Sequence, residues 1–347
     1  MDLETGVITR QALNRVGYLG SLYNIRRDEF LGAEIFDSKL PDDVVSTVDC
    51  HTQNFHLDHE NNYSSTFKHL DVQAELKLSI MGGIIKISGK GNYLSTVNTN
   101  DRYECLTCTS SLITKRDKVH ISYKGVQKCI CKEAFSDPRA THVVTEIVWG
   151  ANVIAKFEQK KTGKNDLQKI GGQLEGAMNI GPGIGAMNTG SGIEGKADVE
   201  VEDKSNNVKD KFSITFVGDV QMNIIPATVA DVATVLKGIP DKIKQMNGGK
   251  GVQLSFVLTP IKEVARYVSA VLPSAFEMVT VRQTNEMLVK RIEKTFDYLL
   301  RDTQRMNGLV ELVKHYSHYL PLHEVDIVED QQVSPFLSSR VFAIIPY

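Results

Sequence analysis

The sequence lacks an excess of charge of either sign, and it lacks any long hydrophobic run. Its 40 lysine and arginine residues nearly balance its 42 aspartate and glutamate residues, which gives a net charge of −2. This balance provides no global field that would attract nucleic acid or anionic lipid, so any partner must be recognised by a local surface. No run of about 18 apolar residues is present that would form a membrane-spanning helix.

Signals for export and for disulfide bonding are also scarce. The opening stretch MDLETGVITRQALNRVGYLG lacks the apolar core of a secretory signal. We therefore expect a cytoplasmic chain, or one that is unconventionally secreted, which is soluble first and membrane-associated on activation. The odd number of cysteines in a long chain does not require a disulfide framework and predicts reduced thiols. These cysteines are Cys50, Cys105, Cys108, Cys129 and Cys131.

Hydrophobic residues make up 41% of the 347 residues, which suffices for a core in one large domain with an appendage, or in two domains. Alternating apolar patterns and β-branched residues predict strands in several segments. Helical periodicity follows Pro226 and extends from about residue 261 to 319, with a break near Pro273. The predicted strands lie within residues 18–37, 101–125, 140–159, 212–225 and 251–261.

The segment LDVQAELKLSI, residues 70–80, carries two conflicting signals. Its even positions are apolar and its odd positions polar, which is typical of a strand with one apolar face. Yet its composition favours helix, and on a helix Leu70, Ala74, Leu78 and Met81 would share one face. A half-buried strand of an ordinary antiparallel sheet is the plainer interpretation. We predict a helix in the water-soluble state, or at least no strand of the central sheet.

Two long insertions, at about residues 40–98 and 160–210, contain such alternating stretches bounded by glycines. A membrane-spanning strand needs about 9 to 11 residues of this pattern. Because unpaired backbone groups are costly in lipid, insertion requires hairpins from many subunits that close a β-barrel. The predicted membrane-inserting residues are Leu70, Val72, Ala74, Leu76, Leu78, Ile80, Ile193, Ala197, Val199 and Val201.

Several glycines are interpreted as hinges or turns. They are Gly82, Gly83, Gly150, Gly171 and Gly172. The run GPGIGAMNTGSG, residues 181–192, lacks the strand–loop–helix setting of a nucleotide-binding loop. It is interpreted instead as a flexible hairpin tip that reaches lipid first.

Five stretches resemble the stonustoxin and verrucotoxin family of fish toxins, whose N-terminal domain belongs to the membrane attack complex/perforin and cholesterol-dependent cytolysin (MACPF/CDC) superfamily. They follow the family's order between about residues 15 and 265. The stretches are LGSLYNIRRDEFL (19–31), LDVQAELKLSIMGGIIKISGKGNYL (70–94), RATHVVTEIVWGANVIAKF (139–157), IPATVADVATVLKGIP (225–240) and VQLSFVLTPIKEV (252–264).

The resemblance implies an α+β fold with a bent, twisted four-stranded antiparallel sheet. Two helical clusters, at about residues 40–98 and 160–210, flank the sheet and refold into transmembrane hairpins within a ring-shaped oligomer. The pore-forming domain would cover residues 1–265, and a helical segment like focal-adhesion targeting modules, with a tail, would cover 266–347. Because the fish toxins act as paired α and β chains, a second, related subunit is also implied.

The superfamily's signature, an aromatic residue with Gly-Thr-His, also has a counterpart in this sequence. Ala140 replaces its usual glycine. The matching positions are Thr141, His142, Val143, Val144 and Trp149, followed by Gly150.

Candidate metal and catalytic groups lack the partners that such sites need. The histidine-rich segment, residues 51–69, offers one His-x-x-His pair without further ligands. It is interpreted as a solvated polar segment, with an acid trigger as the alternative. The Cys105/Cys108 and Cys129/Cys131 pairs suggest buried thiols rather than zinc ligands, since the second pair is Cys-x-Cys on an expected strand. No nucleophile–base set surrounds His142. We expect no enzyme activity, no metal and no cofactor.

Two functions remain open. The first is a pore-forming protein that assembles on a lipid membrane as a homo-oligomer ring, or as a hetero-oligomer with a related subunit. The second is a non-lytic member of the same fold that acts as an interaction or immune-signalling scaffold. Neither involves nucleic acid or a small-molecule substrate.

Overall fold

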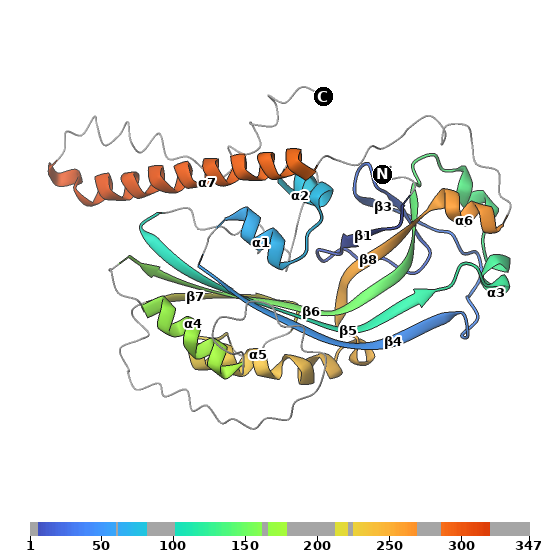
Figure 1. Cartoon of the computed structure of the whole chain (residues 1–347), viewed down its shortest axis with the longest axis horizontal. Coiled ribbons are helices and arrows are strands. Elements are labelled where there is room, and N and C mark those ends of the chain that lie inside the picture. Colours follow the sequence, from blue (N-terminus) through green and yellow to red (C-terminus); the bar gives the residue numbers. More distant parts are fainter. Residues whose placement is uncertain are drawn as a thin grey trace.

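A computed structural model gives the structure of the chain (Figure 1). It describes residues 6–59, 62–81, 101–161, 166–178, 212–220, 225–268 and 286–319.

The described strands form one antiparallel sheet. β4, β5 and β6 pair in that order, and the far edge of β6 is shared by β8, which pairs with residues 142–150, and β7, which pairs with residues 153–158. β1 adds to β8, and the β2–β3 hairpin joins the start of β6. The predicted four-stranded antiparallel sheet is therefore confirmed as the core of a larger one. The strands are β1 (Ile8–Gln11), β2 (Ser21–Asn24), β3 (Glu29–Glu34), β4 (Val45–Asp58), β5 (Tyr103–Val119), β6 (His142–Lys160), β7 (Ser213–Gly218) and β8 (Val252–Pro260).

Helices cover both faces of this sheet. Figure 1 shows α1, α2 and α7 on one face and α4 and α5 on the other, with α3 and α6 at the end near β3. Because helices cover both faces, β6 is buried along nearly its whole length instead of alternating between buried and exposed residues. The helices are α1 (Tyr63–His69), α2 (Ala74–Met81), α3 (Lys124–Lys128), α4 (Asp166–Ala177), α5 (Val229–Lys244), α6 (Ile261–Tyr267) and α7 (Glu286–His315), with 3-10 turns at Lys132–Ser136, Asn247–Gly249 and Ser317–Tyr319.

The largest core lies between the sheet and the α4–α5 layer. α5 begins with a capping box in which the Thr228 hydroxyl accepts from the Asp231 amide while the Asp231 carboxylate accepts from the Thr228 amide. The buried side of α5, including Leu236, packs with Leu174 of α4 against Leu106 and Phe157 of the sheet. This face of the sheet is therefore sealed by two helices.

The predicted extent of the first insertion is wrong at its N-terminal side. Residues 45–58 are β4, paired with β5 from Val45↔Val119 to Asp58↔Thr107, so they belong to the central sheet. The helical part of this insertion begins only at α1. The expected domain boundary at residue 265 falls inside α6, whose Ile261 and Val264 are buried against the body; the division into two domains stays a prediction.

No helix in the part of the chain that the structure describes is both long enough and apolar enough to cross a bilayer.

Candidate functional site

The alternating segment lies in a helical cluster, α1 and α2, between the sheet and α7. The helix prediction is confirmed from Ala74 onward, where α2 begins. The helix is wrong for residues 70–73, which form a turn instead, whereas the prediction that the segment is no strand of the central sheet is confirmed over residues 70–80. Asp71 has φ of +51°, a left-handed conformation that cannot continue a helix. The amides of Asp71 and Val72 donate to the carbonyls of Lys68 and Phe67, which closes the end of α1.

The apolar residues of the alternation are covered by protein in this state. Leu76 is fully buried, and Leu70 and Val72 are 8% and 5% exposed, in a cluster with Phe67 and with Phe296 of α7. Leu78 and Ile80 pack against the same cluster, and Ala74 is half-buried. The predicted single face through Leu70, Ala74 and Leu78 is therefore wrong, because α2 begins too late to include Leu70 and its most buried residue is Leu76.

Two polar residues of the alternation, Lys77 and Ser79, also have partners outside the segment. The Lys77 ammonium lies 3.1 Å from a carboxylate oxygen of Glu293 in α7, and it lies 5.8 Å from the centre of the Phe67 ring. The Ser79 hydroxyl donates to Asp28 at 2.8 Å. Apolar and polar side chains of α2 therefore both contact other parts of the protein.

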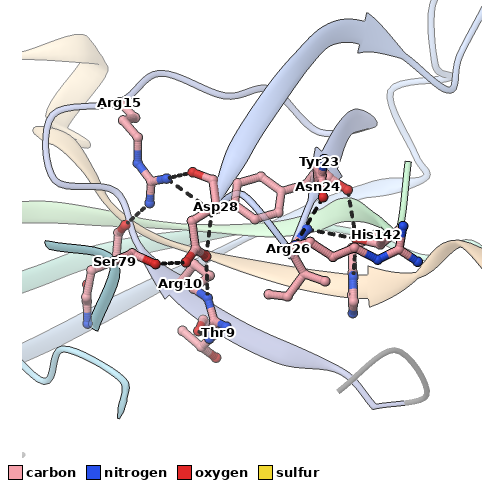
Figure 2. A network of polar contacts seen from close by, with 12 residues as sticks. Thr9, Arg10, Arg15, Tyr23, Asn24, Arg26, Asp28, Ser79 and His142 are labelled. Carbon is pink, nitrogen blue, oxygen red and sulfur yellow. Dashed lines mark hydrogen bonds and ion pairs between the residues drawn. The ribbon is translucent and has the colours of Figure 1, made fainter. Parts of the chain in front are cut away.

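Asp28 is the centre of a buried network, which Figure 2 shows with Ser79 directed toward it from α2. Its carboxylate accepts from Arg10 Nε at 3.0 Å and from the Tyr23 hydroxyl at 3.2 Å. Arg15 donates to the Asp28 carbonyl at 2.6 Å and to the Tyr23 hydroxyl at 3.0 Å. Burial raises the pKa of Tyr23 far above its usual range, so the phenol remains a neutral donor. α2 is thus tied by Ser79 to a buried network in the β1–β2–β3 region.

α7 fastens the cluster from outside and reaches the ends of β5 and β6. Its Asp297 accepts from the Ser64 hydroxyl of α1, and its buried Glu293, 5% exposed, pairs with Lys77 of α2. Further along α7, Glu311 lies 3.7 Å from both Arg102 and Lys160. The helix therefore bridges the α1–α2 cluster and the sheet.

The structure brings together part of the histidine-rich segment. His56 of β4 stacks on His69 of α1 with ring centres 4.7 Å apart, and His69 Nε2 lies 2.8 Å from Asp58. Asp58 also accepts from the Ser65 hydroxyl. Burial, and then the neighbouring His69, lower the pKa of His56. The sequence predicted a cluster of His51, His56, His59 and His69 with Asp58 and Glu60. The structure brings together His56, His69 and Asp58 of this set, whereas His51 and His59 lie exposed and Glu60 lies outside the described residues.

The second predicted cluster is described only over α4. Its Leu167, Ile170 and Leu174 are buried on the sheet face opposite α1 and α2. The other predicted positions lie outside the described residues: Gly82, Gly83, the tip at 181–192, Ile193, Ala197, Val199 and Val201.

Three of the predicted hinge or turn glycines lie inside regular elements, so the turn assignment is wrong for them. Gly150 lies in β6, where a Cβ would come within 1.9 Å of the Leu112 carbonyl oxygen, so the close approach of two strands requires glycine. Gly171 and Gly172 lie in mid-α4, where a Cβ on Gly171 would lie 3.8 Å from Leu106 and a Cβ on Gly172 would meet open space. Their role as hinges stays a prediction.

The signature residues position the start of β6. The Thr141 hydroxyl donates to the Tyr23 carbonyl at 3.0 Å and accepts from the Ile25 amide at 2.9 Å. His142, Val143 and Val144 are fully buried, and His142 Nδ1 lies 3.0 Å from the Thr141 hydroxyl. At the other end of the motif, Trp149 Nε1 donates to Asp117 at 2.8 Å, and Lys250 reaches the same carboxylate at 2.6 Å.

The cysteines do not form one group. Cys105 and Cys108 are buried in β5, and burial raises the pKa of the Cys105 thiol to about 11. The strand expected at Cys129 and Cys131 is wrong, since Cys129 ends α3 and donates to the Gly125 carbonyl. Within the described ranges, no three His, Cys, Asp or Glu side chains are placed to hold a metal ion.

Comparisons with known proteins agree with this architecture. Residues 7–178 match the family described as SNTX, MACPF/CDC-like domain. Cytolytic toxin-alpha from Scorpaena plumieri is 25% identical over 311 residues, which cover 88% of this chain and 41% of that protein. Neoverrucotoxin subunit alpha from Synanceia verrucosa is 27% identical over 307 residues, which cover 86% of this chain and 40% of that protein. The chain thus spans about two fifths of the length of these relatives.

A solved structure supports the fold. The stonustoxin structure aligns with a TM-score of 0.57 at 18% identity, over 97% of this chain and 41% of that one. The resemblance drawn from the five sequence stretches is therefore confirmed, and so is the MACPF/CDC-like fold with a helix following the sheet domain.

Proposed function

We propose that this chain, whose residues 7–178 belong to the SNTX, MACPF/CDC-like family, is a pore-forming protein of the cytolytic-toxin type. It would oligomerise on a membrane and insert two β-hairpins per subunit into a β-barrel pore. The observation that carries the proposal is the conformation of residues 70–80, in which a strand-patterned sequence is largely helical and its apolar residues, together with Lys77 and Ser79, are held by other parts of the protein.

The pattern suits the inserted state better than the stored one. As a strand, the segment would place its apolar positions on one side only, with Leu76, Leu78 and Ile80 toward lipid, while Lys77 and Ser79 would face the lumen. In the helix all five of these side chains are buried or half-buried instead. A segment whose periodicity disagrees with its own helix is expected where a second conformation is required.

β4 provides a route for the change. It ends at Asp58, and α1 starts five residues later, at Tyr63. Extension of β4 beyond Asp58 would convert α1 and α2 into one strand of a hairpin, and extension of β5 before Tyr103 would supply the other strand, without altering the central pairing. The second hairpin would arise from α4 and the residues that follow it, where Ile193, Ala197, Val199 and Val201 would face lipid.

A related subunit is proposed as a partner. Relatives are named as subunits, among them stonustoxin subunit alpha and stonustoxin subunit beta from Synanceia horrida. We therefore propose a ring made either of this chain or of this chain with a second, similar one. We also propose that this chain reaches the membrane from the cytoplasm or by unconventional secretion.

The first experiment measures dye release from liposomes and looks for rings by electron microscopy. Release is expected from the chain alone or with a related subunit added, at pH 7 and at acidic pH. Absence of both release and rings under all these conditions would favour a non-lytic scaffold.

A disulfide lock tests the refolding step. Ser65 of α1 already donates to Asp58 of β4, so Asp58→Cys with Ser65→Cys joins two adjacent side chains. A disulfide keeps two Cα atoms within about 7 Å, whereas a strand extended over these seven residues would separate them by about 23 Å. The oxidised double variant is therefore expected to lose dye release, and reductant should restore it.

The single variant Ser65→Cys and the unmodified chain, each treated with the same oxidant and reductant, are the controls for the native cysteines. Mass spectrometry of the peptides verifies that the two introduced cysteines are bonded to each other. Unchanged release from the oxidised double variant, with this bond verified, would show that α1 does not unfold into a strand.

A further inference from the structure

Charge is sorted between the two sides of α7. Its acidic Glu293, Asp297 and Glu311 face the body, where they contact Lys77, Ser64 and the Arg102–Lys160 pair. The opposite side is rich in exposed basic residues: Lys290, Arg291, Lys294, Arg301 and Arg305. Asp302, which lies 3.6 Å from Arg305, is the exposed acidic residue among them. A helix of nearly balanced composition thus presents a basic outer face.

Large apolar side chains share this outer face. Tyr298 is 60% exposed and Leu309 is 56% exposed; they lie eleven residues apart, which is about three turns, so they point the same way. Tyr316, 49% exposed, lies one residue past the end of α7, where its amide still donates to the Leu312 carbonyl, so it continues the same line; Leu312 is 41% exposed and lies beside it. We call this surface, comprising Lys294, Tyr298, Arg301, Arg305, Leu309, Leu312 and Tyr316, the outer face of α7.

We propose that the outer face of α7 binds an anionic membrane surface. Basic side chains are attracted to anionic headgroups, while Tyr and Leu enter the boundary between headgroups and acyl chains. Tyr is also favoured at that boundary because its ring is apolar and its hydroxyl is polar. Arg301 lies 5.9 Å from the centre of the Tyr298 ring, so the charged and aromatic parts of the face lie together.

A second copy of the chain is a poorer occupant. In a two-fold symmetric pair the same patch meets itself, which would place basic side chains against basic side chains. An anionic lipid surface has the complementary charge and no such restriction. The inference rests on the proposed function, because it names the class of lipid that a pore-forming protein would recognise before insertion.

Sedimentation of the chain with vesicles tests the proposal without requiring a pore. Vesicles of phosphatidylcholine alone are compared with vesicles containing about a third phosphatidylserine, at low and high salt. Binding to the anionic vesicles is expected to be at least about tenfold tighter than to the neutral ones and to weaken in high salt.

Variants assign this binding to the face. Lys294→Glu with Arg301→Glu should lower the affinity for anionic vesicles at least about tenfold, and Leu309→Ser with Tyr316→Ser should lower it at both salt concentrations. The matched control is Lys124→Glu with Lys128→Glu, which reverses two exposed charges on α3, far from α7, and should bind normally. Circular dichroism checks that every variant folds.

The outcomes separate the two proposals. Three outcomes would overturn the assignment to α7. The first is equal binding by Lys294→Glu/Arg301→Glu and by the control, and the second is equal binding to neutral and anionic vesicles. The third is a dimer that only the outer-face variants disrupt. Binding that depends on the outer face but gives no dye release would support it while contradicting pore formation. Dye release that is unchanged in the outer-face variants would support pore formation and contradict the role of the outer face in membrane binding.

Discussion

At the scale of single residues, we expect the Lys77–Glu293 ion pair to hold α2 against α7. Glu293 is 5% exposed and depends on Lys77, which lies 3.1 Å away. Lys77→Met should therefore leave a buried carboxylate without its partner and destabilise the α2–α7 contact by about 3–5 kcal/mol. Hydrogen exchange of α2 amides measures the change.

The double variant Lys77→Met with Glu293→Met is the control for this prediction. Because two apolar side chains of similar size replace the pair, its cost should be much smaller than that of Lys77→Met alone. Equal protection of α2 in Lys77→Met and the unmodified chain would show that the pair does not hold the helix.

A second residue-scale prediction concerns acid. Burial and the neighbouring His69 lower the pKa of His56, and Lys68 acts in the same direction while Asp58 opposes it. The unfolded state therefore takes up a proton at higher pH than the folded state does. Stability from neutral His56 is present above the unfolded pKa near 6.5 and declines as the pH falls from there toward the lowered folded pKa.

We therefore expect the loss of stability between pH 7 and pH 5 to be smaller in His56→Gln than in the unmodified chain. His51→Gln, a change of an exposed histidine on the same strand, is the control and should leave the pH dependence unchanged. Urea unfolding at several pH values supplies the comparison, and identical pH dependence in His56→Gln would rule out this histidine as an acid-sensitive group.

At the scale of elements, the sequence predicted β5, β6 and β8 because β-branched and aromatic residues dominate them. It did not predict β4, whose Asp49, His51 and Asn54 resemble a solvated loop. Among the described strands β4 pairs with β5 alone, so it lies at an edge, where polar side chains are tolerated. Pairing over its whole length, rather than its own composition, makes it a strand.

The sequence predicted the helix at the candidate site but not the residues that this helix contacts. The helix-forming composition of residues 74–81 identified the stored helix, whereas the partners Asp28 and Glu293 are 51 and 216 residues distant from Ser79 and Lys77. Local spacing carries no information about such pairs. The break at Asp71 was also missed, because a left-handed residue follows from how α1 ends and not from the alternating pattern.

The element scale also provides a test of refolding in α4. A Cβ on Gly172 meets nothing within 4 Å, so Gly172→Ala should stabilise this helix by about 0.5–1 kcal/mol. If α4 must unfold before insertion, the substitution should slow dye release several-fold. Gly238→Ala is the matched control, since Gly238 also has open space but lies in α5, which is not proposed to refold. Equal rates for the two variants would exclude α4 from the slow step.

At the scale of the whole molecule, α7 offers separate surfaces for two events that the proposed pore formation requires in order. Its inner side holds α1 and α2 through Glu293, Asp297 and Phe296. Its outer face carries the exposed basic and aromatic residues. A surface already exposed in the stored state needs no refolding to meet lipid, so docking can precede release of the cluster.

The disulfide lock between positions 58 and 65 tests this order. Position 58 is the last residue of β4 and position 65 lies in α1, so the lock changes no residue of α7 or of its outer face. The oxidised variant should therefore sediment with anionic vesicles as the unmodified chain does and yet release no dye, because docking is complete while extension of β4 is blocked. Adding reductant to the bound protein should start release without a new binding step. Loss of vesicle binding on oxidation would instead mean that the cluster must open before the membrane is recognised.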